Sequence, residues 1–434
     1  MGCTSSKSPP GGPPKKRTIP GGLGAEDIEK RRISKEGSTT TADLAIDFAV
    51  LTQRGYYPST PTKPNQDAYL AIPQLNGDEN VSLFAVFDGH GAVGHTCARF
   101  TAGKLPENLK EATDKGMDWP TALTTAFEKT NLDLRESQVN DEHSGTTCCA
   151  LVFVGGTCYI ANVGDSRAVV ARKRLIDSPH ARSNGDSTSY DSPPDADSSR
   201  LRTCDLSAEA MGDTAERLIA KPLSCDQTPF RKDERDRVKL AGARVLTAQQ
   251  LSGSKRKTEE FDEPGENEFD TEGDPPRIWL KSKASPGTAF SRSFGDAEAE
   301  SVGVYATPEI EVREVRQDDT YIVIASDGVF EFLTNQNVVD IVQGYGDSSL
   351  EACRSVVLEA YAQWMTWDTR SDDITMILLK VGGGQEEALP VDLEFSQGVK
   401  AASEGGSVRR RAGSLYGGSA ADHLDEEEEA LPRI

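Results

Sequence analysis

The sequence predicts an α+β fold in which stacked β-sheets carry helices on their outer faces. Short apolar strands occur in runs, and amphipathic helices accompany them at two places along the chain. This order is typical of sheet layers covered by helices. Strands and helices do not alternate regularly, which disfavours a parallel, doubly wound sheet. A chain of 434 residues is long enough for one or two buried cores.

The first part of the domain combines three strands with two helices. Apolar runs predict strands at 44–51, 68–72 and 83–87, and helices are expected near 92–110 and 119–135. Apolar side chains recur in the second helix at positions i, i+3, i+4, i+7 and i+8, which places them on one face. These side chains are Trp119, Ala122, Leu123, Ala126 and Phe127.

Strands dominate the next part of the chain. They are predicted at 146–154, 157–161 and 167–171, with Gly155-Gly156 as a two-residue hairpin turn between the first two. The C-terminal part is predicted to contain two further strands, a helix and a final strand. Their ranges are 309–315, 321–325, 350–366 and 374–381.

Composition divides the chain into one domain with two insertions and two tails. The domain is expected at 42–382, and polar, acidic insertions interrupt it near 175–215 and 251–276. Residues 1–41 are rich in Pro, Gly, Ser and Lys and are expected to be disordered, as is the polar, acidic tail at 383–434.

Charge and cysteine usage exclude several classes of function. The net charge of −22 disfavours a nucleic-acid-binding protein, which needs a basic surface. The eight cysteines show neither a C-x-x-C pair nor zinc spacing with the five histidines, so a reduced, intracellular chain is expected. The longest apolar run, 148–154, is much shorter than a membrane-spanning helix.

Aspartates at the ends of apolar strands are the most informative feature of the sequence. At any one position an Asp-Gly pair can simply be a turn. Five aspartates at strand ends in one domain favour convergence, and converging carboxylates would repel one another unless a cation neutralised them. Mg²⁺ and Mn²⁺ are the cations that prefer such oxygen ligands. The five are Asp67, Asp88, Asp165, Asp327 and Asp372.

Seven motifs in order give the chain a strong resemblance to a known family. The chain resembles the metal-dependent protein serine/threonine phosphatases, the PP2C or PPM family, from about residue 44 to 381. The motifs are Asn65-Gln66-Asp67, Phe87-Asp88-Gly89-His90-Gly91, Ser144-Gly145-Thr146-Thr147, Asn162-Val163-Gly164-Asp165-Ser166-Arg167, Ser291-Arg292-Ser293-Phe294-Gly295-Asp296, Ala325-Ser326-Asp327-Gly328 and Ser371-Asp372-Asp373-Ile374-Thr375.

The resemblance implies a fold and a metal centre. The fold would be an αββα four-layer sandwich, with two stacked, mainly antiparallel sheets flanked by helices and a centre for two Mg²⁺ or Mn²⁺ ions at one edge. A third, weaker metal site would involve Asp165 together with Asp327. The main metal ligands would be the side chains of Asp67, Asp88, Asp327 and Asp372 and the carbonyl of Gly89.

The implied activity is hydrolysis of phosphoserine and phosphothreonine in protein substrates. A water activated by the two metal ions would attack phosphorus directly, without a covalent enzyme intermediate. His90 matches the histidine proposed to protonate the leaving oxygen, although a histidine at a turn with no catalytic role is the alternative.

The chain departs from the family pattern around its first motif. Gln66 stands where many members have Glu, and Thr62 stands where many have a phosphate-binding Arg. Lys63 and Arg54 are the nearby candidates for binding the phosphate, and the sequence does not decide between them. Residues 222–303 resemble the family's flap, enlarged here by the acidic insertion.

The basic N-terminal segment predicts attachment to a membrane. Met1-Gly2-Cys3-Thr4-Ser5-Ser6 fits the N-myristoylation motif at Gly2, and Cys3 is a candidate for palmitoylation. Residues 1–36 carry a net charge of +4, which would add attraction to anionic lipid. We therefore expect a cytoplasmic protein anchored to the inner face of the plasma membrane or to another membrane. Basic residues also precede Ser34 and Ser414, where ordinary solvated charge is favoured over phosphorylation sites.

Two other functions compete with the phosphatase. A pseudophosphatase would keep the sandwich as a scaffold, but such proteins typically lose metal aspartates, and here Asp67, Asp88, Asp327 and Asp372 are all present. A metal-dependent nuclease would need a basic cleft, which the acidic domain disfavours. The expected form is a monomeric enzyme whose partners are phosphoprotein substrates.

Overall fold

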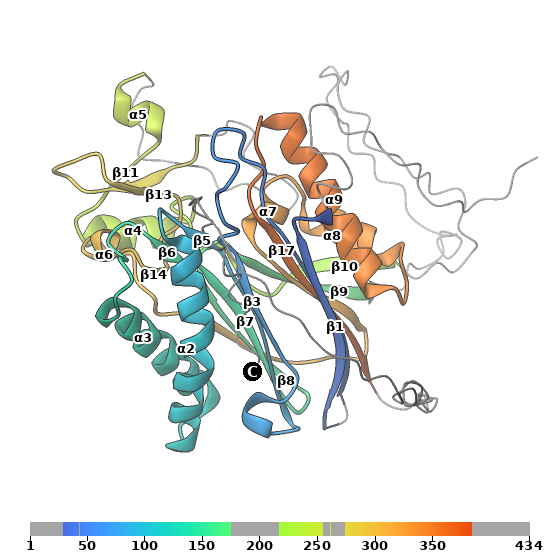
Figure 1. Ribbon diagram of the computed structural model, residues 1–434. Coiled ribbons are helices and arrows are strands. Elements are labelled where there is room, and N and C mark those ends of the chain that lie inside the picture. Colours follow the sequence, from blue (N-terminus) through green and yellow to red (C-terminus); the bar gives the residue numbers. More distant parts are fainter. Residues whose placement is uncertain (1–28, 43, 175–216, 255–260, 262–273, 384–434) are drawn as a thin grey trace, which may run out of the picture. The chain divides into compact units, whose positions relative to one another are not determined.

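The computed structural model describes residues 29–42, 44–174, 217–254, 261 and 274–383 (Figure 1). The predicted lipidation sites Gly2 and Cys3, the insertion 175–215, most of the insertion 251–276 and nearly all of the C-terminal tail, Ser414 included, lie outside this range. No helix of the described part is both long and apolar enough to cross a bilayer.

Six antiparallel strands form the larger sheet. Their spatial order is β1-β2-β17-β16-β9-β10. In that order the strands span Arg32–Thr41, Leu44–Gln53, Ile374–Gly383, Asp319–Ala325, Arg167–Arg174 and Arg217–Pro222.

Five antiparallel strands form the second sheet, in the order β15-β8-β7-β4-β3. They span Glu309–Glu314, Thr157–Val163, Cys148–Val154, Val81–Phe87 and Ala68–Ile72. The hairpin between β7 and β8 turns at Gly155, whose φ of +57° suits a glycine.

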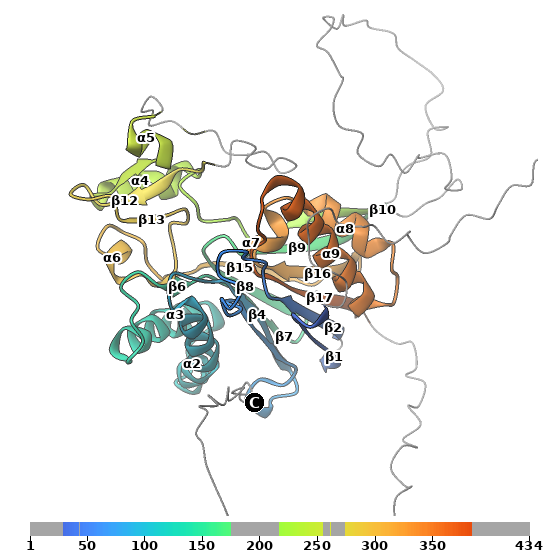
Figure 2. The ribbon, with the colours of Figure 1, turned by 45° about the horizontal axis from the view of Figure 1, so that its top comes forward.

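Helices cover the outer face of each sheet, as Figures 1 and 2 show. Helices α2 (Gly94–Asp114) and α3 (Trp119–Glu136) pack on the second sheet. On the six-stranded sheet lie α7 (Asp327–Phe330), α8 (Asn335–Gln343) and α9 (Ser349–Trp367).

The alternation of side chains along β4 explains the layers. Leu83, Ala85 and Phe87 pack beneath α2 and α3, whereas Phe84 and Val86 point between the two sheets. Both faces of the strand are therefore apolar and buried, which requires a layer on each side. The predicted αββα sandwich is confirmed.

A smaller unit stands beside the sandwich. It contains α4 (Lys232–Leu240), α5 (Ala248–Ser252), α6 (Ala297–Glu300) and a three-stranded sheet, β11 (Arg244–Leu246), β12 (Arg277–Trp279) and β13 (Pro286–Thr288). We call this unit, within residues 222–303, the flap. It has a separate apolar cluster, with members from α4, β11, β12 and α6: Val238, Val245, Ile278 and Ala299.

Three short strands link the flap to the sandwich, in the order β14-β6-β5. They span Phe294–Gly295, Gly145–Thr146 and Gly89–His90. A short 3-10 helix, η1 (Leu75–Gly77), completes the described elements. The predicted strand 146–154 is thus divided, because Thr146 pairs within this small sheet while Cys148 begins β7.

The structure corrects the predicted start of the domain. Residues 32–41, expected to be disordered, form β1, and each of them has a partner in β2. Backbone pairing orders this strand although most of its side chains are exposed, so apolar periodicity could not reveal it. Ser34 therefore lies on an edge strand. At the other end, β17 extends to Gly383, the first residue of the expected tail.

Candidate active site

Strand register brings three of the predicted aspartates to one edge of the six-stranded sheet. The end of β16 lies beside the starts of β17 and β9, because Ala325 is opposite both Met376 and Arg167. Asp327 follows β16, Asp372 precedes β17 and Asp165 precedes β9. The second sheet repeats this arrangement, because Ala68 is opposite Phe87, with Asp67 and Asp88 adjacent to the pair.

A hydrogen bond joins the two edges. The hydroxyl of Ser326 donates to Oδ2 of Asp67 at 3.0 Å and accepts the backbone N–H of Thr375 at 3.1 Å. Asp67 from the second sheet is thereby fixed against the ends of β16 and β17 in the first. The five predicted aspartates consequently belong to one site.

Burial and mutual repulsion dominate the electrostatics of this site. Burial, together with the charges of Asp327 and other neighbouring acids, raises the pKa of Asp88 well above its ordinary value. For Asp327, burial and the charge of Asp165 act in the same direction. Burial is also the first cause for Asp67, whose pKa rises to about 8, and for Asp165, whose pKa rises to about 6.

Two fully buried carboxylate oxygens in the cluster have no hydrogen-bond donor among the described residues. Oδ1 of Asp67 and Oδ1 of Asp327 are buried and accept no hydrogen bond from any described residue. A buried, unsatisfied carboxylate oxygen is costly. A hard divalent cation would satisfy both oxygens and remove the repulsion, so these residues fit a Mg²⁺ or Mn²⁺ site.

Glycines allow the backbone to approach closely beside Asp88. A Cβ on Gly89 would lie 2.4 Å from the carbonyl oxygen of Gly94 and 2.5 Å from that of Gln66. Gly91 has a φ of +82°. Its carbonyl accepts a hydrogen bond from Nε2 of Gln66 at 2.8 Å, so the amide that replaces the family's usual Glu helps to fix this loop. Any larger residue at 89 would displace the carbonyl that we expect to bind metal.

Asp372 and Asp373 have different roles. Asp372 Oδ1 accepts hydrogen bonds from the Tyr57 hydroxyl and from the backbone N–H of Asp373. The Asp373 carboxylate accepts two backbone N–H groups, from Gly55 at 2.6 Å and from Gln66 at 2.8 Å. Asp373 thus organises the chain around the site. Tyr57 and this role of Asp373 were not predicted, although Asp373 belongs to the last of the seven motifs and Tyr57 precedes the first.

His90 is paired with a buried carboxylate. Its Nε2 lies 2.6 Å from Oδ2 of Asp296, which also accepts the hydroxyl of Ser293 at 2.6 Å. Burial lowers the pKa of His90, but the charge of Asp296 and its hydrogen bond outweigh burial, so the pKa is raised. The ring packs on Phe290 with a centroid distance of 4.4 Å. Asp296 lay within a quoted motif, but sequence alone did not pair it with His90.

The two candidates for phosphate binding lie in different settings. Nζ of Lys63 stands 3.9 Å from the centroid of the Tyr57 ring, and its charge acts on Asp373. Arg54 follows the end of β2, and its backbone N–H bonds to the carbonyl of Arg31 at 3.0 Å. The structure therefore brings Lys63, through the Tyr57 ring, close to a predicted metal ligand.

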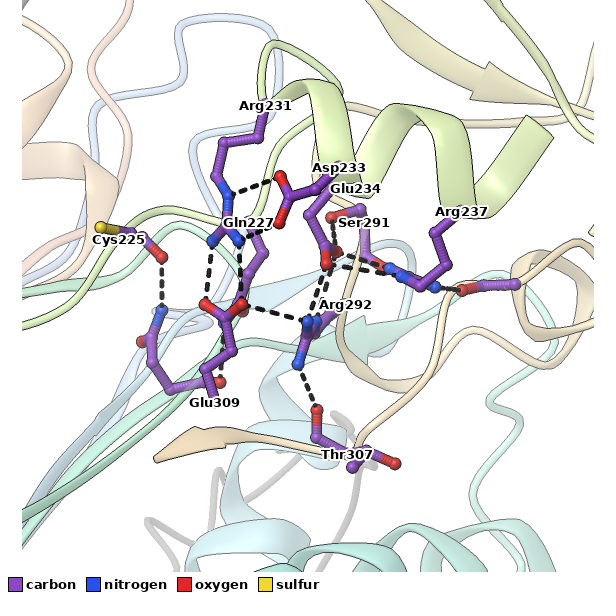
Figure 3. A network of polar contacts seen from close by, with 12 residues as sticks. Cys225, Gln227, Arg231, Asp233, Glu234, Arg237, Ser291, Arg292, Thr307 and Glu309 are labelled. Atoms are coloured by element: carbon purple, nitrogen blue, oxygen red, sulfur yellow. Dashed lines mark hydrogen bonds and ion pairs between the residues drawn. The ribbon is translucent and has the colours of Figure 1, made fainter. Parts of the chain in front are cut away.

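A second acidic cluster lies where the flap meets β15. Asp233 and Glu234 of the flap and Glu309 of β15, here called the flap acids, bring one oxygen each within 4.8 Å of the others (Figure 3). It is the one such group of three among the described residues. Arginines neutralise it, because Glu234 accepts from Arg292 at 2.7 Å and Glu309 accepts from Arg231 at 2.8 Å. Guanidinium groups already fill the role of a cation here, so this cluster is structural.

Gln227 connects this flap network to the loop that carries Asp165. Its side-chain oxygen accepts the N–H of Gly164 at 2.7 Å, and its amide nitrogen donates to Glu309 at 3.0 Å. Gly164 adopts a φ of +100°, which favours glycine at this turn. The flap network thus helps to hold Asp165 at the common edge.

Comparisons with known proteins point to one family. A family model described as "Protein phosphatase 2C" matches residues 61–184 and 210–366. "Probable protein phosphatase 2C 35" of Arabidopsis thaliana is 40% identical over 334 residues, which cover 77% of this chain and 83% of the relative. "Probable protein phosphatase 2C 64" of Oryza sativa subsp. japonica is 30% identical, with coverages of 84% and 75%.

A solved structure supports the same fold. The serine-threonine phosphatase 2C from Toxoplasma gondii superimposes with a TM-score of 0.55 at 17% identity, covering 81% of this chain and 99% of that one. The sandwich, the ordered motifs and the extent of these matches together show that the chain belongs to the protein phosphatase 2C family.

Proposed function

We propose that this chain is a Mg²⁺- or Mn²⁺-dependent protein phosphatase that hydrolyses phosphoserine and phosphothreonine. The observation that carries the proposal is the group of buried and half-buried aspartates at the common edge of the two sheets, with two buried oxygens that no described residue satisfies. Membership of a phosphatase family supports the reaction class, and the donor set supports hard divalent cations.

The proposed roles follow from position. Asp67, Asp88, Asp327 and Asp372, with the carbonyl of Gly89, would hold two cations, and Asp165 would contribute to a weaker third site. When bound, such cations lower the pKa of a water and stabilise the charge that develops on phosphate oxygens, which allows direct attack on phosphorus.

His90 and Asp296 would together supply the proton for the leaving serine or threonine oxygen. Asp296 raises the pKa of His90 and so favours the protonated ring, the form that a general acid requires. Lys63 would attract the substrate phosphate as a point charge. Lys63 contacts the ring of Tyr57, whose hydroxyl donates to Asp372, and this favours Lys63 over Arg54 for this role.

The test is hydrolysis of a phosphothreonine peptide with and without Mn²⁺. The wild-type protein should be active only with metal, and Asp327→Asn should lose that activity. Asp47→Asn, which changes an exposed acid on β2, is the matched control and should behave as wild type. Activity that survives both chelation and Asp327→Asn would contradict the metal mechanism. No wild-type activity with Mn²⁺ would favour the pseudophosphatase instead.

We also propose that the protein is anchored to a cytoplasmic membrane surface by acylation at Gly2 and Cys3. Support comes from the sequence motif and the basic residues that follow it. Gly2→Ala should move the protein from the membrane fraction to the soluble fraction of cells. Unchanged membrane association of this variant would argue against acylation as the anchor.

A further inference from the structure

Three consecutive residues before the first motif contact three consecutive residues of the last. Gly55 bonds to Asp373, Tyr56 to Ser371 and Tyr57 to Asp372. We propose that Tyr57 is a positioning residue for the metal ligand Asp372, and that this segment of β-type pairing sets the affinity of the site for its cation. The inference rests on the proposed function, because it takes Asp372 to be a ligand.

The backbone part of this contact fixes the chain on both sides of Asp372. Tyr56 and Ser371 exchange two backbone hydrogen bonds, of 3.1 and 3.0 Å, in an isolated antiparallel bridge. Gly55 permits this approach, because a Cβ there would lie 2.7 Å from the carbonyl oxygen of Ser371. The main chain at 371–373 is therefore held by the segment 55–57 whatever the side chain of Asp372 does.

The side-chain part selects one oxygen of the carboxylate. The hydroxyl of Tyr57 and the backbone N–H of Asp373 both donate to Oδ1 of Asp372. No donor to Oδ2 is found among the described residues, so Oδ2 is the oxygen available to a cation. The Tyr57 ring is buried, with 8% of its surface exposed, which restricts the directions from which the hydroxyl can donate. Such outer partners orient metal ligands and commonly change metal affinity by 10- to 100-fold.

The same ring carries Lys63 on its face. Nζ of Lys63 lies 3.9 Å from the ring centroid, within the range of a cation–π contact. The ring and the hydroxyl therefore serve different neighbours. Tyr57→Phe removes the hydrogen bond to Asp372 but keeps the ring beneath Lys63, whereas Lys63→Met keeps the hydrogen bond and removes the charge.

The test measures binding of Mn²⁺ to the metal-stripped full-length chain, using the electron paramagnetic resonance signal of free Mn²⁺ to monitor it. Tyr57→Phe should weaken the tightest class of sites by about 10- to 100-fold. Tyr321→Phe is the matched control. Tyr321 is 6% exposed and its hydroxyl donates to the carbonyl of Gly346 at 2.8 Å, but it lies toward the opposite end of β16 from Asp327. Its Mn²⁺ affinity should stay within about twofold of wild type, because it is remote from the ligands.

Steady-state kinetics separate positioning from a general structural effect. At saturating Mn²⁺, Tyr57→Phe should keep the KM of the phosphopeptide, since Lys63 remains in place. Lys63→Met should raise that KM and leave Mn²⁺ affinity unchanged. Equal Mn²⁺ affinities for Tyr57→Phe and Tyr321→Phe would overturn the inference, as would a Tyr57→Phe protein that loses affinity only because its melting temperature has collapsed.

The outcomes also distinguish this inference from the proposed function. A wild-type protein that binds Mn²⁺ but does not hydrolyse phosphopeptides refutes the phosphatase. Under that result, weakened binding in Tyr57→Phe still supports the positioning role of Tyr57. A wild-type protein that binds no Mn²⁺ refutes both.

Discussion

Two groups of acidic side chains in this molecule have opposite surroundings. In the flap, Glu234 is 2% exposed, yet hydrogen bonds from Arg292, Arg237 and Ser291 overcome the effect of burial and lower its pKa to about 2. At the common edge of the sheets, burial and other acids raise the pKa of Asp67 to about 8 and that of Asp88 well above its ordinary value.

The difference shows which acids the protein itself neutralises. Arginines next to the flap acids supply both charge and fixed hydrogen-bond donors (Figure 3). At the sheet edge, Ser326 and Tyr57 donate hydrogen bonds but bring no positive charge. The sheet-edge cluster, whose five aspartates form no ion pair with a described arginine or lysine, is the one that we propose takes up cations, although the flap acids lie closer together.

The largest effect should follow from changing an acid at the sheet edge. Asp88→Asn should lower kcat/KM for a phosphothreonine peptide by about 10³-fold, because it removes part of a stabilisation worth several kcal/mol. Activity measured across Mn²⁺ concentrations checks this. If Asp88→Asn kept wild-type activity at low Mn²⁺, the sheet-edge acids would not differ from the flap acids in their need for a cation.

A change in the flap should have a smaller effect, and it should act on the stability of the protein. Glu234→Gln leaves Arg292 and Arg237 without their carboxylate, and breaking a buried ion pair in this way costs about 3 kcal/mol of unfolding free energy. Denaturant unfolding measures the change. Glu111→Gln, which breaks an exposed pair with Lys115 on α2, should leave stability unchanged. Equal effects of the two substitutions would show that the flap network is not a buried structural pair.

The pH dependence of stability should have opposite signs for the two clusters. The folded pKa of Asp67 is raised, so the metal-free folded state binds more protons than the unfolded state, and stability should fall as pH rises from about 4 to about 8. The pKa of Glu234 is lowered, so its contribution should disappear as pH falls from about 4.5 to about 2.

In either pH range, the titration of one group can change the free energy of unfolding by at most about 1.4 kcal/mol per pH unit. Unfolding of the metal-free protein at a series of pH values provides the curve. Asp67→Asn should flatten the plot of unfolding free energy against pH between about pH 4 and 8. Glu234→Gln should flatten it between about pH 2 and 4.5. A slope that survives its own substitution would assign the titration to another group.

The sandwich and the aspartates at its common edge could be predicted from the sequence because both depend on local order. An apolar strand followed by an acid can be read directly, and antiparallel register then determines that the ends of β16 and β17 meet. The strand β1 could not be found in this way, because its order comes from pairing with β2 and most of its side chains are exposed.

The hydrogen-bond partners of the site residues also could not be predicted from the sequence. Asp296 lies 206 positions from His90, and Tyr57 lies 315 positions from Asp372. No periodicity connects such pairs, since only the folded chain brings them together. The pairing of Arg292 with Glu234 and of Arg231 with Glu309 likewise could not be predicted from the sequence.

Thermal unfolding of the metal-free protein and its variants tests most directly the claim that, of the two clusters, arginines neutralise the flap acids but not the sheet-edge acids. Asp88→Asn should unfold at a higher temperature than the metal-free wild type, because it relieves repulsion among buried acids, whereas Glu234→Gln should unfold at a lower temperature. Adding Mn²⁺ should stabilise the wild type and Glu234→Gln but stabilise Asp88→Asn much less. Metal-free Asp88→Asn that is destabilised like Glu234→Gln, with an undiminished response to Mn²⁺, would contradict the account.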